Sequence, residues 1–165
     1  MAGPEQFFPG ARTVRSASRA LIISDGKLLA IKMKRPREPE LFFILPGGGQ
    51  RHGETLIDSL KRECREELGF EPEVGALAYV REYIGKNHSF ASKHKNFHQL
   101  EVVFHCQVPK GITIDLNCCG DRNQIGAEWI ALEDLPESNF YPRKILDFIQ
   151  DSNIDPDPIY LGDIN

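Results

Sequence analysis

The sequence has few of the features that direct a protein to a membrane or to nucleic acid. No stretch approaches the roughly 20 consecutive apolar residues that a membrane span needs. Acidic residues outnumber basic ones, and the formal net charge of −4 gives no general attraction to nucleic acid or to a membrane surface. Residues 1–10 lack a basic region followed by a long apolar run, so no signal peptide is expected. These absences predict a cytoplasmic protein with neither a membrane nor a nucleic acid as its partner.

Cysteines are also few, and they form no metal-binding or catalytic pattern. No CxxC pair occurs, and a reducing cytosol would keep the cysteines as thiols. No His-paired nucleophile pattern accompanies them, so core packing is favoured over catalysis for the two that fall on apolar faces. The four are Cys64 and Cys106, which lie on apolar faces, and Cys118 and Cys119.

Repeats and low-complexity segments are missing as well, and the length of 165 residues suits one domain with a sizeable core. We expect a single domain over residues 1–165, with 1–11 and 151–165 as loose or docked tails.

Apolar and alternating segments predict a mixed β-sheet with helices packed on it. Residues 20–23 and 28–31, joined by Asp25-Gly26, are typical of a β-hairpin. Residues 41–45 predict a buried strand. Strict alternation over 100–108 predicts a strand with one face in the core and the other toward solvent. Further strands are expected at 74–84 and 127–132, and a helix near Pro142 with Ile145, Leu146, Phe148 and Ile149 on its apolar side.

One segment, from Gly48 to Phe70, places seven residues at fixed offsets. The order is Gly, any five, Glu, any seven, Arg-Glu, any two, Glu-Glu, any one, Gly. At average usage such a match has odds on the order of 10⁻⁹ to 10⁻⁸ per window, so chance does not explain it. The seven residues are Gly48, Glu54, Arg62, Glu63, Glu66, Glu67 and Gly69.

The second half of this segment predicts a helix with two different faces. Thr55 and Asp58 form a capping-box-like start, and Gly69 suits the left-handed position after the end. An apolar stripe recurs every four residues, at Leu56, Leu60, Cys64 and Leu68. A separate stripe carries Glu63, Glu66 and Glu67, whose mutual repulsion a bound cation would reverse.

The chemistry of these acids favours a hard metal ion. Three carboxylates without Cys or His suit Mg²⁺, and the adjacent Arg62 can fix a carboxylate by bidentate hydrogen bonding. A solvated acidic face is the alternative for three glutamates alone. The preceding loop, Gly47-Gly48-Gly49, follows a strand and would let the backbone approach a ligand or metal closely. A strand, a glycine loop and an acid-faced helix in succession favour a functional site.

Residues 48–70 resemble the Nudix box, the signature of a superfamily that hydrolyses nucleoside diphosphates linked to another moiety. All seven specified positions match; the two bulky-aliphatic positions hold Cys64 and Phe70 instead. The resemblance implies an α/β/α sandwich with a mixed sheet, and a divalent metal, Mg²⁺ or alternatively Mn²⁺. The implied metal ligands are Glu63, Glu66, Glu67 and the Gly47 carbonyl, with Arg62 and Glu54 orienting the acids.

A general base must take a proton from the attacking water. The resemblance implies either a box glutamate or an acid from a later loop; we prefer Glu63, with Asp121 and Glu128 as further candidates. Gly48 and Gly49 are candidates for substrate contact. Arg19 is another, for which a solvated or salt-bridged side chain is the alternative.

Residues 85–98 form a second region of interest because they carry lysines and histidines but no acid. Phe90 and Phe97 offer faces on which a base can stack. We expect Lys93 and Lys95 to help bind the phosphates or base of the substrate, with a solvated, mobile connection as the alternative. A zinc site is a weaker option, since a helix would bring two histidines together but no third ligand is evident. The cations are Lys86, Lys93 and Lys95, and the histidines are His88, His94 and His98.

Other activities stay open. A diphosphate isomerase with a related box would need a catalytic cysteine, and a nucleotide-sensing module would usually have lost box glutamates. A hydrolase of capped RNA is disfavoured by the overall charge. The downstream positions Lys86-Asn87-His88 match no subfamily marker, so ADP-ribose or a nucleotide sugar is the default substrate. Family members are often dimers, which leaves a homodimer as an option.

Overall fold

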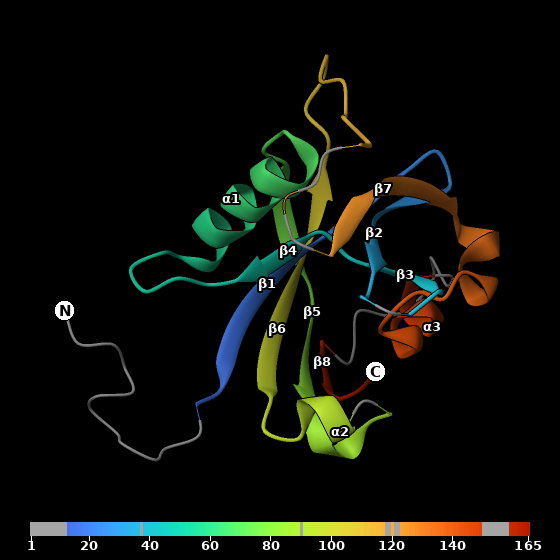
Figure 1. Ribbon diagram of the computed structural model, residues 1–165. Coiled ribbons are helices and arrows are strands. Elements are labelled where there is room, and N and C mark those ends of the chain that lie inside the picture. Colours follow the sequence, from blue (N-terminus) through green and yellow to red (C-terminus); the bar gives the residue numbers. More distant parts are fainter. Residues whose placement is uncertain (1–12, 37, 90, 118–119, 121–122, 150–158) are drawn as a thin grey trace.

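The computed structural model describes residues 13–36, 38–89, 91–117, 120, 123–149 and 159–165 (Figure 1). The strands are β1 (Arg15–Ser24), β2 (Lys27–Lys34), β3 (Leu41–Ile44), β4 (Gly47–Gly49), β5 (Glu73–Ile84), β6 (His98–Gln107), β7 (Gln124–Ala131) and β8 (Tyr160–Asp163). The α-helices are α1 (Leu56–Leu68), α2 (Ala91–His94) and α3 (Leu146–Ile149), and the 3₁₀ helices are η2 (Gly85–Asn87), η3 (Leu132–Glu137) and η4 (Arg143–Ile145).

The sheet is mixed, as predicted. Its order is β3-β2-β1-β6-β5-β8, with β4 paired to β1 and β7 paired to β2. The β1–β6 and β5–β8 pairs are parallel, and the other pairs are antiparallel. Figure 1 shows α1 beside β4 at one side of the molecule and α3 beside β3 at the other.

Apolar side chains fill two cores, one on each face of the sheet. One core joins the buried side of α1 to β1 and β2, and Trp129 of β7 packs against it. The other core joins η3, η4 and α3 to the opposite face, through residues such as Leu135 and Ile145. Two helical layers around one sheet confirm the α/β/α sandwich.

The predicted hairpin and box helix are both confirmed. Strands β1 and β2 pair around Asp25 and Gly26, whose φ values of 49° and 70° suit a tight hairpin turn. Thr55 and Asp58 make the reciprocal capping box of α1, and Gly69 ends the helix at φ 77°.

Two expectations near the glycines were wrong. The three glycines form a short strand, β4, because their backbones pair with β1 at Ala17, Ser18 and Arg19. Glycines have no side-chain alternation from which such pairing can be predicted. Residues 41–44 form a strand at the sheet edge, and the side chains of Phe42, Phe43 and Ile44 are only half-buried.

Strand β6 also differs from its prediction. Its polar face was expected in solvent, but Gln99 and Glu101 are 5% and 3% exposed, whereas Leu100 and Val102 are half-buried. The physical reason is that arginines on the neighbouring strands pair with Glu101, so its charge can be buried. The first half of this face is therefore buried, whereas His105 and Gln107 farther along it are exposed, as predicted.

The C-terminal part is only partly as expected. The predicted helix near Pro142 consists of η4 and the short α3, and Phe148 is 36% exposed, although it was expected on the packed side. Of the predicted tail, 159–165 is docked because β8 pairs with β5 and Ile164 is buried. No helix in the described part of the chain is long and apolar enough to cross a membrane.

Candidate active site

The site is built around the contact between α1 and β4. Glu67 comes from the buried side of the helix and is 7% exposed. Its Oε2 accepts a hydrogen bond from the Gly47 amide at 2.8 Å. Glu67 is therefore in direct contact with the Gly47 backbone, 20 residues away, through the amide of Gly47 and not through the carbonyl that is the candidate metal ligand.

Each glycine of β4 leaves space for a different group, and at Gly47 both the backbone conformation and the contact with β1 exclude a side chain. Gly47 has φ +122°, and a Cβ there would lie 2.2 Å from the Ser18 carbonyl oxygen. A Cβ at Gly48 would lie 2.6 Å from the Glu63 carboxyl carbon, and one at Gly49 would lie 2.2 Å from the Arg15 guanidinium. The strand thus leaves room for one carboxylate and one arginine side chain.

Arg62 organises the carboxylates on the solvent side of the helix. It holds Glu54 with two hydrogen bonds, at 2.6 and 3.0 Å, and it donates to Glu63 at 2.7 Å. It also donates to the Gly49 carbonyl at 3.0 Å, which ties the helix to β4. The hydrogen bonds that Arg62 donates lower the pKa of Glu54 to about 2, and accepting them, Glu54 and Glu63 raise the pKa of Arg62. Arg62 thus contacts both Glu54 and Glu63, while the orienting role that the resemblance implies for Arg62 and Glu54 stays a prediction.

The third acid, Glu66, is more exposed. Its carboxylate lies 3.6 Å from Arg62 and 3.8 Å from Arg51. Within the described residues, no three His, Cys, Asp or Glu side chains converge on a common point as ligands of one ion. The donor set nevertheless fits a hard cation, because it consists of oxygens alone and β4 has the steric space for the Glu63 carboxylate.

On the opposite side of β4 lies a buried cluster of charges that sequence reasoning missed. Arg19 of β1 donates to Glu101 at 2.8 Å, to the Leu45 carbonyl at 3.2 Å and to the Gly47 carbonyl. Arg81 of β5 donates to the other oxygen of Glu101. Burial alone would raise the pKa of Glu101, but attraction to Arg81 and Arg19 outweighs it and lowers the pKa to about 2.

A cavity of about 140 Å³ opens beside this cluster. Phe42 forms part of its wall, with the Arg35 guanidinium 4.4 Å above the ring and Tyr141 edge-on at 6.3 Å between centroids. The cavity combines aromatic and charged groups, a mixture that suits a small polar ligand with a ring. It is lined by Arg19, Arg35, Phe42, Ile44, Leu45, Arg81, Tyr83, His94, Gln99, Glu101, Tyr141, Pro142 and Asn165.

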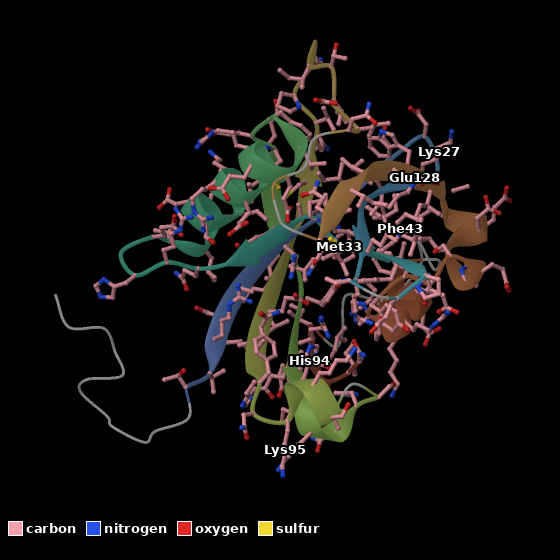
Figure 2. All side chains as sticks on the ribbon, viewed as in Figure 1. Lys27, Met33, Phe43, His94, Lys95 and Glu128 are labelled. Carbon is pink, nitrogen blue, oxygen red and sulfur yellow. The ribbon has the colours of Figure 1, made fainter. Side chains whose placement is uncertain are left out.

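The lysine- and histidine-rich segment 85–98 is less free than expected. Acids from distant segments contact two of its side chains: Lys93 lies 2.6 Å from Glu38, and His88 lies 2.5 Å from Asp163. Figure 2 shows Lys95 directed away from the body of the molecule, below α2. Phe90 lies outside the described residues.

The zinc hypothesis for this segment was wrong. His94 ends α2 and His98 begins β6, so the two are not on one helix. His94 instead contacts the Tyr83 hydroxyl at 2.9 Å, at the edge of the cavity.

Of the two further candidate acids, only Glu128 lies among the described residues. Glu128 pairs with Lys32 at 2.5 Å, and Figure 2 shows it on β7, well apart from α1. Asp121 lies outside the described residues. The neighbouring Gly120 packs against the helix backbone, since a Cβ there would lie 2.6 Å from the Glu66 carbonyl oxygen. Gln124 holds this contact by donating to the Glu67 carbonyl at 2.9 Å, a role that its sequence position does not indicate.

The described cysteines belong to the core, as predicted. Cys64 and Cys106 are 0% and 5% exposed, and burial raises the pKa of both thiols. A thiol with a raised pKa is a poor nucleophile. Cys118 and Cys119 lie outside the described residues.

Comparison with solved structures defines the class of fold. The NUDIX hydrolase from Nitrosomonas europaea superposes with a TM-score of 0.66 at 21% identity, over 84% of this chain and 87% of that one. The MutT NUDIX hydrolase from Burkholderia pseudomallei gives a TM-score of 0.62 at 26% identity, over 81% of this chain and 95% of that one. An ADP-ribose pyrophosphatase from Streptococcus suis 89-1591 gives a TM-score of 0.59 at 18% identity, over 92% of this chain and 100% of that one. The fold is therefore a Nudix fold.

Sequence comparison gives the family. The family model of the NUDIX domain matches residues 14–149. The ADP-ribose pyrophosphatase of Methanocaldococcus jannaschii is 32% identical over 126 residues, which are 76% of this chain and 67% of that protein. The chain belongs to the Nudix hydrolase family, so it is an enzyme acting on phosphorus-containing acid anhydrides.

Proposed function

We propose that the protein is a Mg²⁺-dependent pyrophosphohydrolase that cleaves the diphosphate of a nucleoside diphosphate linked to another moiety, with ADP-ribose or a nucleotide sugar as substrate. The observation that carries this proposal is that Gly47 contacts both halves of the site. Its amide donates to Glu67 on the acidic helix, and its carbonyl accepts from Arg19 in the cavity wall. A substrate with its base or sugar in the cavity would have its diphosphate beside β4 and the carboxylates.

The metal would be held by Glu63, Glu66 and Glu67, with help from the Gly47 carbonyl. Bound there, Mg²⁺ (or Mn²⁺) would offset the charge of the diphosphate and make the attacking water more acidic. Because the Gly47 carbonyl also accepts from Arg19, it would serve both partners through its two lone pairs.

The chain's own residues would then position the reacting groups and take up a proton. Arg62, fixed by Glu54, holds the Glu63 carboxylate next to Gly48. From this position Glu63 would accept the proton of the attacking water. Gly48 and Gly49 would let the diphosphate approach the backbone. Arg19 would bring positive charge to the cavity end of the diphosphate.

The substrate class rests on the relative from Methanocaldococcus jannaschii and on the cavity. That relative is an ADP-ribose pyrophosphatase, and the aromatic wall at Phe42 offers a face for a planar base. The isomerase alternative needs a catalytic cysteine, and neither Cys64 nor Cys106 is accessible. The sensing-module alternative is disfavoured because every box glutamate is present.

The test is a screen for Mg²⁺-dependent turnover of ADP-ribose, nucleotide sugars, dinucleoside polyphosphates and oxidised nucleotides. We expect a nucleoside monophosphate as product from one of the first two classes. The Glu67→Gln variant should lower kcat by about 10²- to 10³-fold, because it removes a charge from the metal site. Glu71→Gln, in an exposed pair with Arg65, is the matched control and should match the wild type.

Two results would refute the proposal. One is the absence of nucleoside monophosphate from every substrate with Mg²⁺ or Mn²⁺. The other is near-wild-type turnover in Glu63→Gln, Glu66→Gln and Glu67→Gln alike.

A single domain over the chain, a cytoplasmic location and a homodimer stay predictions from the sequence.

A further inference from the structure

The cluster of buried charges behind β4 calls for an explanation other than stability. Arg81 and Glu101 are 8% and 3% exposed, and Arg19 completes the group. Burying such charges removes them from water, and well-packed apolar residues in their place are often at least as stabilising. A buried ionic group is more readily explained by what it holds in position.

What the cluster holds can be followed atom by atom. Arg81 donates through one terminal nitrogen to the Ile164 carbonyl at 2.7 Å, and through Nε to Glu101. Glu101 accepts with its second oxygen from Arg19, at 2.8 Å. Arg19 donates to the Gly47 carbonyl, and the Gly47 amide donates to Glu67. Hydrogen bonds thus run without a break from the C-terminal segment to the acidic helix.

A second branch leaves the same carboxylate. Gln99 donates to Glu101 at 3.1 Å and accepts from Arg15 at 2.7 Å. The Arg15 guanidinium in turn lies directly against Gly49, where a Cβ would come within 2.2 Å of it. Glu101 therefore orients the two arginines that support both ends of β4.

We propose that Arg81 is a positioning residue of the active site, which fixes Glu101 and, through Arg19, sets the Gly47 backbone against Glu67. The inference rests on the proposed function, because it assigns Gly47 and Glu67 to the metal end of the site. Arginine is needed at position 81 because its planar fork reaches Glu101 and the Ile164 carbonyl at once. A lysine there keeps the charge but cannot make both contacts in this geometry.

Arg81 also lines the cavity, so a direct contact with substrate is the competing role. The two roles have different kinetic signatures. A contact that binds the substrate and the transition state equally well contributes only to affinity, so its loss raises KM and leaves kcat unchanged. Loss of positioning lowers kcat and weakens metal binding, because outer partners of a metal site typically contribute about 10-fold or more to each.

The experiment compares Arg81→Lys and Glu101→Gln with a matched control on the same strand. Glu82 lies next to Arg81 on β5 and also contacts β8, accepting from the Tyr160 hydroxyl at 2.9 Å, but it has no such path to Gly47. Glu82→Gln therefore tests whether loosening β8 is enough to produce the effect. Measurements on each full-length variant are Mn²⁺ binding by electron paramagnetic resonance, amide hydrogen exchange over residues 45–49, and steady-state kinetics with ADP-ribose and Mg²⁺.

We expect both cluster variants to bind Mn²⁺ about 10-fold more weakly, to exchange amides of residues 45–49 about 10-fold faster and to lose about 10-fold in kcat with little change in KM. In the double variant, Arg81→Lys should add little to the effect of Glu101→Gln, since both substitutions break the same hydrogen-bond path to Gly47. Glu82→Gln should match the wild type in all three measurements.

Unchanged Mn²⁺ binding and exchange in a folded Arg81→Lys protein would overturn the proposal, and so would an effect confined to KM. An equal effect of Glu82→Gln would assign the result to β8 docking and overturn it too. If Arg81→Lys does not fold, Glu101→Gln decides by the same criteria. If the wild type cleaves no substrate, the proposed function fails, while Mn²⁺ binding and amide exchange still decide this inference.

Discussion

The molecule carries two charged clusters, one on each side of β4, and they are held in different ways. The cluster on α1 draws its acids and Arg62 from residues 54–67 and is partly solvated, with Glu66 43% exposed at its side chain. The cluster at Glu101 draws on β1, β5 and β6, and its carboxylate is 3% exposed. The first cluster therefore keeps an exposed carboxylate, Glu66, whereas the Glu101 carboxylate in the second is bonded on both oxygens by buried arginines. We therefore expect substitutions in the first to affect catalysis more than stability, and substitutions in the second to affect both.

The largest effect on stability should come from breaking the buried cluster. Glu101→Gln leaves two buried arginines without their counter-charge, and we expect the free energy of unfolding to fall by about 3–5 kcal/mol. Urea denaturation measures this change. Glu71→Gln, in the exposed pair with Arg65, should lose less than about 1 kcal/mol. Equal losses in the two variants would remove the distinction between the clusters.

The same carboxylate should make stability depend on pH in a defined window. The pKa of Glu101 is lowered from 4.5 to about 2 in the folded state, so its ionised form stabilises the fold above pH 4.5. That contribution, about 3 kcal/mol, should be lost as pH falls from 4.5 through about 2. Urea midpoints measured across this range should converge for wild type and Glu101→Gln. Parallel curves would show that another group controls acid stability.

A smaller effect is expected where β4 approaches the acidic helix. In Gly48→Ala the new Cβ would meet the Glu63 carboxyl group, which must move, but the side chain is flexible and the fold should survive. We expect kcat to fall by about 10- to 100-fold because a catalytic group is displaced, with a small change in melting temperature. Gly53→Ala meets nothing within 4 Å but is strained at φ +89°, so it shows the effect of backbone strain without a displaced carboxylate. Wild-type kcat in Gly48→Ala would show that the position of Glu63 is not critical.

The smallest effect should come from segment 85–98, which belongs to neither cluster. Reversing the charges of Lys93 and Lys95 should raise KM by no more than about 5-fold, because exposed charges contribute about 1 kcal/mol or less. Lys93 is already paired with Glu38, which weakens its attraction for a phosphate. An unchanged KM would remove this segment from the substrate site. Lys61, which is half-buried on α1, offers a comparison beside the acidic cluster.

The acidic cluster could be predicted from the sequence because its members are close along one helix. The period of the helix places Glu63, Glu66 and Glu67 together, and Arg62 lies eight residues from its partner Glu54. The capping residues and the apolar stripe follow from the same local rules. The spacing did not predict that the glutamates differ in exposure: Glu67 is buried against β4, whereas Glu66 is exposed.

The buried cluster could not be predicted, because its contacts join residues 82 and 20 positions apart. Arg19 and Glu101 each directly precede an apolar run of their strand, and that was the available sign. The alternation rule assigned Glu101 to solvent, since it takes no account of ion pairs formed between neighbouring strands. The contacts of Lys93 with Glu38 and of His88 with Asp163 could not be predicted for the same reason, because these acids are remote in sequence.

Trp129, which packs beside α1 in one of the two cores, has a practical consequence. It is the single tryptophan of the chain, so its fluorescence emission reports one location. The other core, beneath η3 and α3, contains Tyr79 and no tryptophan among its described residues. Tryptophan emission and far-ultraviolet dichroism, followed together during unfolding, would therefore show whether the two faces of the sheet open in one step or in sequence.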